Sequence, residues 1–256
     1  QAGKKVEVRL PKFLTTGSKA LDILFGGYES GILSLFYGPA GSGKSTLAVH
    51  VPIAVISEYM YSKYGGIPDN YYFYVVDGDE GMGFDVDRLR QILDVRGLPV
   101  EEILAHVIVF SPTEFDHQHK YVTAEIPGMV AAGKKPLLIA LDSAVMIYHG
   151  IILRTDPQHR PTRIQEYAGK LELQLKTMSK LAKETRCVSI VTSWPKSSMS
   201  ASEMVKKNIP PEDKVGVDDM PPCIGGRAFA FYPKMIVEIR VPKDRGPVRT
   251  AFLFKH

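Results

Sequence analysis

The chain has few cysteines and no long apolar run. Only two cysteines, Cys187 and Cys223, occur in 256 residues. Their spacing suits neither a disulfide framework nor a metal site, so we expect a reducing, cytoplasmic setting. No stretch of 18 apolar residues and no signal-peptide pattern is present, so we expect no membrane span. Basic residues exceed acidic ones by only four (net charge +4), which is compatible with a polyanionic partner without demonstrating one.

Apolar runs alternate with helical patterns along most of the chain. The runs "YYFYVVD" (71–77) and "PLLIALD" (136–142) are typical of buried strands. From Ile164 to Ala182, apolar residues recur at helical spacing. This alternation predicts an α/β fold with a twisted, mostly parallel central sheet covered by helices on both faces.

The expected elements form one domain over residues 1–256, with no linker or internal repeat. Two strand-like runs, 234–241 and 248–254, are separated by the turn-like "PKDRGP" and predict a C-terminal antiparallel hairpin. Pro52 is expected to kink the helix that contains it or to leave a carbonyl group exposed. We predict strands at 33–38, 71–77, 106–112, 136–142 and 187–193, and helices at 45–64, 84–95, 120–132 and 164–182.

A glycine-rich motif joins the first predicted strand to the first predicted long helix. "GPAGSGKS" (38–45) fits the pattern G-x-x-x-x-G-K-S, in which backbone N–H groups wrap phosphates and the lysine reaches the β- and γ-phosphates. The serine hydroxyl of this motif holds Mg²⁺. We therefore predict ATP and Mg²⁺ as ligands. The expected nucleotide-binding residues are Gly38, Pro39, Ala40, Gly41, Ser42, Gly43, Lys44, Ser45 and Thr46, with Lys44 also catalytic.

Carboxylates follow two of the predicted strands. Asp142 ends "LLIALD" and is the candidate Mg²⁺ partner of Ser45; the alternative is a helix-capping residue. In "VVDGDEGMG" (75–83), Asp79 and Glu80 are candidates for positioning the attacking water. Asp77 could instead cap a turn or support the metal. An exposed acidic turn is the alternative interpretation of the whole segment.

With these motifs in order, the chain resembles the ATPase core of the RecA/RadA recombinase superfamily over nearly its whole length. "LTTGSKALDILFGG" (14–27) is similar to the segment before the P-loop of archaeal RadA. "DGDEGMGFDVDRL" (77–89) is similar to the family's D-T-E-x-x-F-x-x-E-R-L block. That resemblance implies that Arg88 stacks on adenine and that Glu80, or Asp79 in another placement of one inserted residue, activates water.

The resemblance also implies two DNA-contacting segments. The first is a loop at about 146–162, and the second lies between Trp194 and "IGGRAFAFYP" (224–233). Trp194 stands where the family has the glutamine that senses the γ-phosphate; it could stack on a base or simply fill a gap beside the sheet. The DNA-binding candidates are Arg154, His159, Arg160, Trp194, Lys196 and Arg227.

No N-terminal helical domain and no Phe-x-x-Ala subunit-docking motif is seen, so the chain is most similar to an archaeal RadA paralog of the RadB/RadC type. The resemblance implies a weak, DNA-dependent ATPase in recombination and repair, whose partners are single-stranded DNA or a RadA-type recombinase. An oligomer is possible, although no filament-forming motif is seen in the sequence. The alternatives are an adaptor that holds ATP without hydrolysing it and a KaiC-like signalling ATPase.

Overall fold

A seven-stranded sheet organises the chain in the computed structural model, which describes residues 7–79, 83–195, 223–241 and 248–255. The strand order is β5-β4-β6-β7-β3-β8-β9. All neighbours are parallel except β8 and β9, which pair antiparallel. The predicted fold class and C-terminal hairpin are therefore confirmed. The strands are β3 (Leu33–Tyr37), β4 (Tyr71–Asp77), β5 (Val107–Phe110), β6 (Lys135–Asp142), β7 (Val188–Ser193), β8 (Met235–Arg240) and β9 (Thr250–Lys255).

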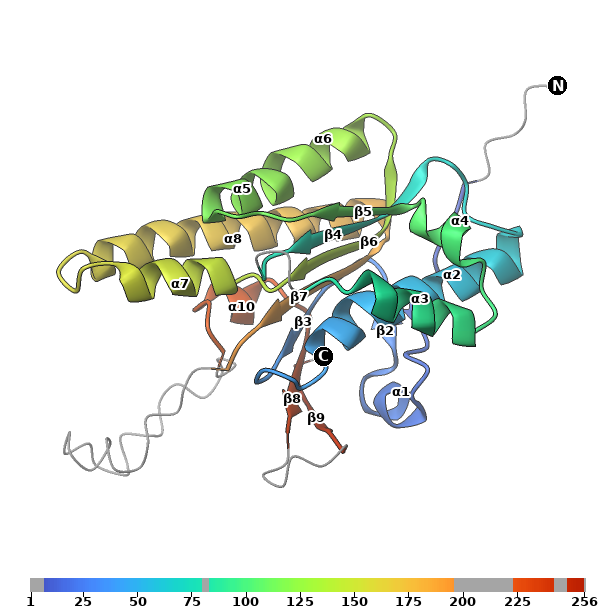
Figure 1. Ribbon diagram of the computed structural model, residues 1–256, viewed down its shortest axis with the longest axis horizontal. Helices are drawn as coiled ribbons and strands as arrows, with labels where there is room; N and C mark the ends of the chain where they lie inside the picture. Colours follow the sequence, from blue (N-terminus) through green and yellow to red (C-terminus); the bar gives the residue numbers. More distant parts are fainter. Residues whose placement is uncertain (1–6, 80–82, 196–222, 242–247, 256) are drawn as a thin grey trace.

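Helices cover both faces of this sheet (Figure 1). One face carries α2 (Val51–Tyr64), α3 (Val86–Val95) and α4 (Val100–Leu104). The other carries α5 (Phe115–Lys120), α6 (Ile126–Ala131), α7 (Met146–Arg154) and α8 (Arg160–Thr185). The shorter elements are α1 (Lys19–Phe25), α10 (Ala228–Phe231) and an antiparallel pair of β1 (Phe13–Leu14) with β2 (Tyr28–Glu29). None of the helices in the described ranges is long and apolar enough to cross a membrane.

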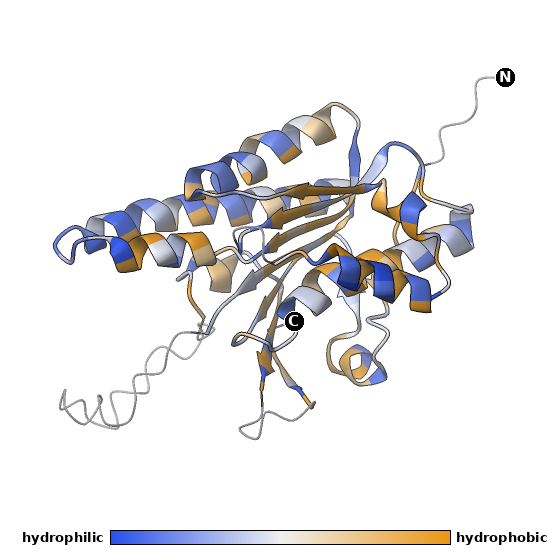
Figure 2. Cartoon of the chain, in the orientation of Figure 1, coloured by the Kyte–Doolittle hydropathy of each residue, from blue (hydrophilic) through white to orange (hydrophobic). Residues whose placement is uncertain are grey.

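The continuous apolar runs of the strands follow from this two-sided cover. Along β6, Leu138 and Ala140 pack into the core cluster on one face, whereas Ile139 and Leu141 pack into the cluster on the other. Because successive strand residues point to opposite faces, both sets must be apolar when both faces are covered. Figure 2 shows the result, with hydrophobic colour concentrated on the strands.

Two prolines are accommodated by π-helical turns. The turns η1 (Thr46–His50) and η2 (Tyr121–Glu125) each lead into a helix that has a proline in its first turn, Pro52 in α2 and Pro127 in α6. Proline has no N–H to continue an i→i−4 ladder, and the wider turn before it absorbs the break. The disturbance expected at Pro52 therefore falls in the turn immediately after the glycine-rich motif.

The long helix α8 buries the predicted face only from Tyr167 onward. Leu171, Leu175 and Met178 are buried as its spacing predicts, but Ile164 is 42% exposed. The first turns of α8 extend with α7 beyond the sheet (Figure 1). Ile164 belongs to these turns and therefore does not pack against the sheet.

A buried amide links α5, α8 and the end of β6. The Gln118 side-chain Nε2 donates to the carbonyl oxygen of Ala144 at 3.1 Å and to Gln174 Oε1 at 2.9 Å. Both glutamines are fully buried. Because Ala144 lies two residues after Asp142, this network fixes the chain where it leaves the sheet.

We predict that Gln118→Ala destabilises the protein by about 2 kcal/mol or more, because it leaves the Ala144 carbonyl and Gln174 unpaired in the interior and opens a cavity. Urea unfolding followed by far-UV circular dichroism measures this. Gln165→Ala, at an exposed position of α8, is the control and should change stability by less than about 0.5 kcal/mol. Equal effects of the two substitutions would contradict the role of the network.

Candidate nucleotide-binding site

The glycine-rich motif forms a tight loop between β3 and η1. Gly41 and Gly43 have φ values of 70° and 92°, which glycine adopts without strain. Behind the loop, the backbone passes so close to β8 that a Cβ on Gly38 would lie 2.3 Å from the Ile239 carbonyl oxygen. The residues predicted as a phosphate cradle therefore do form a concave loop at the carboxyl end of the sheet.

Lys44 is buried at the centre of the site. Its Nζ donates to the carbonyl oxygen of Pro39 at 2.9 Å, and its side chain lies in a cavity of about 400 Å³ that Asp79 and Asp142 also line. Burial lowers the pKa of Lys44, while the charges of Asp142 and Asp79 oppose this shift. The lysine is thus a desolvated cation whose closest charges are two carboxylates.

Asp142 ends β6 and is almost completely buried. Thr192 Oγ1, at the end of the neighbouring strand β7, donates to Asp142 Oδ1. Asp142 Oδ2 has no hydrogen-bond partner among the described residues. Burial raises the pKa of Asp142, whereas Thr192, Ser45 and Lys44 lower it. A buried carboxylate oxygen without a donor is costly unless a cation or another donor joins it.

Asp77 and Asp79 have different roles in the loop after β4. Asp77 accepts hydrogen bonds from the backbone N–H groups of Asp79 (3.1 Å), Gly83 (3.2 Å) and Phe84 (3.1 Å). It therefore shapes the loop, as the turn-capping alternative predicts. Asp79 instead lines the Lys44 cavity, and its Oδ1 is buried without a partner among the described residues.

The pKa of Asp79 is raised to about 6 by burial and by the charges of Asp142 and Asp77, against the effect of Lys44. The loop passes close to β6, because a Cβ on Gly78 would lie 2.1 Å from the Ser143 carbonyl oxygen. Glycine is required for that approach, and it brings Asp79 to the cavity. Glu80, the other candidate for positioning water, lies outside the described residues.

A second cavity adjoins the first across the glycine-rich loop. It has a volume of about 540 Å³ and is lined by Arg88 of α3, by residues of α1 and η1, and by β8 and β9. The start of α3 is fixed by Asp85, whose side chain accepts a hydrogen bond from the Arg88 backbone N–H. The His50 ring from η1 stacks on the Phe84 ring, and His50 Nε2 lies 3.0 Å from the Asp85 carbonyl oxygen. Arg88 thus lies beside a cavity next to the glycine-rich loop.

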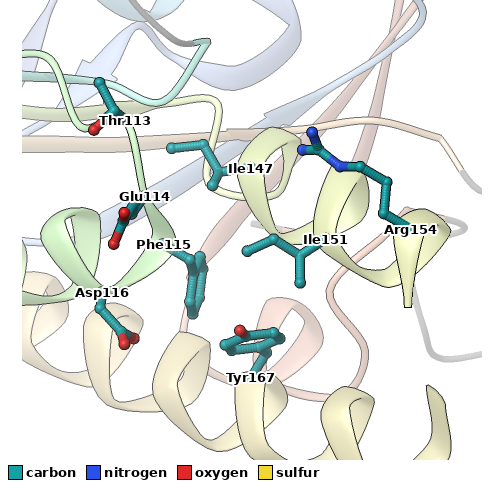
Figure 3. A pocket seen from close by; sticks show the side chains of 8 residues that line it. All are labelled: Thr113, Glu114, Phe115, Asp116, Ile147, Ile151, Arg154 and Tyr167. Carbon is teal, nitrogen blue, oxygen red and sulfur yellow. The ribbon is translucent and has the colours of Figure 1, made fainter. Parts of the chain in front are cut away.

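The first predicted DNA loop is largely helical. Residues 146–154 form α7, because Ile147 and Ile151 face inward at helical spacing toward Phe115 and Tyr167 (Figure 3). The expectation of a loop over 146–162 is therefore wrong for this part. The signal was the i, i+4 apolar spacing of Ile147 and Ile151, which the sequence prediction did not use.

The three basic candidates of this region have different surroundings. Arg160 donates to the carbonyl oxygens of Thr155 (2.9 Å) and Leu153 (3.2 Å), so it caps the end of α7. Arg154 reaches over a pocket that Glu114 and Asp116 also line (Figure 3). His159 is exposed just before α8.

The second predicted DNA segment begins at Trp194, beside the glycine-rich loop. The Trp194 ring centroid lies 5.7 Å from Lys44 Nζ, within cation–π range, and Trp194 lines the Lys44 cavity. Arg227 is exposed immediately before α10, and Lys196 lies outside the described residues. The structure thus brings Trp194 to the P-loop, while Arg154, His159 and Arg160 lie on the α7–α8 hairpin.

Sheet topology and site together define a P-loop protein of the RecA type, and comparisons with known proteins agree. The Rad51 family pattern matches residues 10–253. The chain belongs to the Rad51 family, and the predicted resemblance to RadA paralogs of the RadB type is confirmed.

Several relatives carry the name "DNA repair and recombination protein RadB". That of Pyrococcus furiosus is 30% identical over 181 residues, which cover 70% of this chain and 67% of the relative. That of Methanocaldococcus jannaschii is 24% identical over 235 residues, 92% of this chain and 89% of the relative. That of Thermococcus kodakarensis is 37% identical, but over 110 residues that span only 43% of each chain. The crystal structure of the RadB recombinase matches with a TM-score of 0.64 and 24% identity, covering 95% of this chain and 90% of that one.

We predict that Asp142→Asn stabilises the protein. The substitution removes a buried charge with an unpartnered oxygen and keeps an acceptor for Thr192, so the melting temperature in the absence of ligands should rise by about 2–6 °C. Differential scanning calorimetry measures this. Asp94→Asn, at an exposed position of α3, is the matched control and should leave the melting temperature nearly unchanged. A lower melting temperature for Asp142→Asn would contradict a net cost of the buried carboxylate.

Proposed function

We propose that this chain binds ATP with Mg²⁺, hydrolyses it slowly and acts in DNA recombination and repair. The observation that carries the proposal is the convergence of Lys44, Asp142 and Asp79 in one cavity beside the glycine-rich loop. The cavity holds a desolvated lysine and two buried carboxylate oxygens that have no hydrogen-bond partner in the part of the chain that the structure describes. Such a cavity fits a phosphate chain accompanied by a divalent cation. The relatives' names support the assignment to repair.

Each residue has a defined task in this proposal. The backbone N–H groups of residues 38–45 hold the phosphates, and Lys44 leaves the Pro39 carbonyl to reach them. Ser45 and Asp142 hold Mg²⁺, which neutralises charge that develops on the phosphates. Mg²⁺ bound in this way would complete its coordination with phosphate oxygens and water, because this ion usually keeps several waters and few protein ligands. Arg88 covers the base.

Asp79 is the carboxylate that we propose orients the attacking water. It lines the Lys44 cavity, and its Oδ1 accepts no hydrogen bond from any residue that the structure describes. Both oxygens of Asp77, in contrast, accept hydrogen bonds from the loop backbone. Glu80 follows it directly in the chain, so the two positions are tested together.

Trp194 offers a physical link between the nucleotide cavity and the proposed DNA-binding segment. The Ile224 backbone N–H donates to the Trp194 carbonyl oxygen at 2.8 Å, and Ser193 Oγ donates to the Ile224 carbonyl oxygen at 2.6 Å. Pro195 and Cys223 form an isolated β-bridge. A change at Trp194 is therefore passed to the chain that leads to Arg227. We propose single-stranded DNA as the partner there, because phosphates attract Arg227 and bases stack on aromatic rings.

A second candidate function is an adaptor that holds ATP without turnover and acts through protein contacts with a RadA-type recombinase. The observation that favours it is the tryptophan at the position where the resemblance implies a γ-phosphate-sensing glutamine. An indole ring covers Lys44 but lacks the amide needed to report on a phosphate in the same way.

The two functions are separated by steady-state ATP hydrolysis with and without single-stranded DNA, with Lys44→Ala as the blank. Stimulation by DNA is expected for the repair ATPase. Tight ATP binding without turnover, with or without DNA, would contradict it and support the adaptor.

We predict that Asp79→Asn lowers ATP turnover by about 100-fold or more while ATP binding stays within a few-fold of wild type, because water positioning acts only on the chemical step. Glu80→Gln, measured beside it, should then have the smaller effect. The reverse order would transfer the role to Glu80, and no loss in either variant would remove the water-activating step from the proposal.

We also predict that nucleotide binding changes the emission of Trp194, the only tryptophan of the chain, because phosphates draw Lys44 away from its ring. The change should saturate at the dissociation constant measured independently by calorimetry. Binding by calorimetry with constant emission would show that the Lys44–Trp194 contact does not respond to the ligand.

A further inference from the structure

A buried imidazole lies between the turn after the glycine-rich loop and the start of α3. His50, the last residue of η1, is only 2% exposed. Its Nδ1 lies 3.2 Å from the carbonyl oxygen of Ser45, and its Nε2 lies 3.0 Å from the carbonyl oxygen of Asp85. Because carbonyl oxygens only accept hydrogen bonds, an imidazole N–H is the donor in this bridge. One side chain thus joins two segments that are far apart in sequence.

The segment that His50 contacts is fixed at both of its ends. At one end, the Phe84 backbone N–H donates to Asp77 Oδ2 at 3.1 Å. At the other, the Asp85 side chain accepts a hydrogen bond from the Arg88 backbone N–H at 2.9 Å. The His50 ring stacks on the Phe84 ring, with centroids 5.7 Å apart and planes inclined by 4°. A change in the position of His50 therefore acts on the first turn of α3, which carries Arg88.

The π turn η1 gives His50 this position. A π turn holds one residue more than an α-helical turn, so the side chains at its end are rotated by about 100° relative to a continuous α-helix. A second buried side chain supports the same turn, because the Tyr28 hydroxyl donates to the carbonyl oxygen of Leu47 at 2.7 Å. Figure 1 shows α3 beside α2, the helix into which η1 leads. Ser45, the residue before the turn, and α3 therefore share the same imidazole.

We propose that His50 is a positioning residue of the nucleotide site, which makes the placement of Arg88 depend on the turn that follows Ser45. The inference rests on the proposed nucleotide binding, in which residues 38–45 hold the phosphates and Arg88 covers the base. A nucleotide contacts both parts at once, so a fixed distance between them lowers the cost of ordering α3 on binding. A ligand made of phosphates alone reaches only the first part and gains nothing from the bridge.

The test is a double-mutant cycle on the affinities of ATP and inorganic tripolyphosphate, both measured with Mg²⁺ by calorimetry. His50→Phe keeps an aromatic ring beside Phe84 and removes both nitrogen contacts. It should weaken ATP by about three- to tenfold, because the hydrogen bonds that fix α3 are lost, and leave tripolyphosphate within about twofold of wild type. In an Arg88→Ala background, where the base contact is absent, it should change the ATP affinity by less than about twofold.

Tyr28→Phe is the matched control, because it removes a hydrogen bond from the same turn at Leu47. It should lower the melting temperature but leave the ratio of the ATP and tripolyphosphate affinities within about twofold of wild type. An equal change of this ratio in Tyr28→Phe and His50→Phe would indicate a general loosening of the turn and overturn the role of His50.

Thermal melting verifies that each variant is folded. Phe84→Leu removes the stacking partner of His50 and keeps an apolar side chain, so it replaces His50→Phe in the cycle if that variant does not fold. A smaller loss, again confined to ATP and absent in the Arg88→Ala background, is then expected, and an unchanged ATP affinity would overturn the coupling.

The outcomes separate this inference from the proposed function. If wild type binds neither ligand, nucleotide binding itself fails and the inference fails with it. If wild type binds both but Arg88→Ala binds ATP equally well, Arg88 does not cover the base and the coupling through it is overturned as well. If Arg88→Ala weakens ATP, only the role of His50 is overturned by any of three results for His50→Phe: the same ATP loss in both backgrounds, no loss in either, or an equal loss for tripolyphosphate.

Discussion

Negative charge buried beside one lysine is the constraint on which this structure depends. Asp77 and Asp142 end adjacent parallel strands in register, and Asp79 follows two residues after the first of them. Three carboxylates in so small a space repel one another and lose hydration. Asp77 is compensated by three backbone N–H groups and Asp142 in part by Thr192, whereas the compensation of Asp79 within the described residues comes from the charge of Lys44. The charge that remains unbalanced faces the cavity, and this imbalance favours the binding of a cation there.

The sheet produces this arrangement because its central strands are parallel. Their carboxyl ends lie at one edge, so β3, β4, β6 and β7 deliver the glycine-rich loop, Asp77, Asp142 and Ser193 to one place. The packing that holds the strands is apolar on both faces, and the polar groups emerge only where the strands end. The π turn η1 lies directly behind Lys44, and the Gln118–Gln174 pair lies behind Asp142. The site is therefore supported from both layers of helices.

Much of this could be predicted from the sequence, for reasons that are local. The order of strands and helices follows from apolar runs and spacing, and the motif at 38–45 requires a strand before it and a helix after it. The position of Asp142 could be predicted because it is the single acidic residue at the end of a clear apolar run. The different surroundings of Asp77 and Asp79 could not be predicted, because they depend on which carboxylate oxygens accept hydrogen bonds from backbone N–H groups in the folded loop.

The helix α7 was missed because the segment was interpreted through the family resemblance rather than through the spacing of Ile147 and Ile151. The hydrogen bond of Arg249 to the Gly41 carbonyl oxygen could not be predicted either, because nothing in "GPVRT" indicates that the C-terminal hairpin returns to the glycine-rich loop.

The position of Trp194 connects these points. Among the described residues, Lys44 is surrounded by the Pro39 carbonyl oxygen, the Trp194 ring and the carboxylates of Asp79 and Asp142. A ligand that takes the lysine must replace the first two, and only the carboxylates remain in place. The Trp194 indole N–H has no partner among the described residues, so no hydrogen bond of its own holds the ring where it is. Its backbone, in contrast, is fixed to Ile224. In the function that we propose, the ring responds to the lysine and the backbone hydrogen bond to Ile224 carries the response toward α10. The proposed link from nucleotide to partner thus depends on an aromatic contact with the lysine, where the family resemblance implies an amide contact with the phosphate.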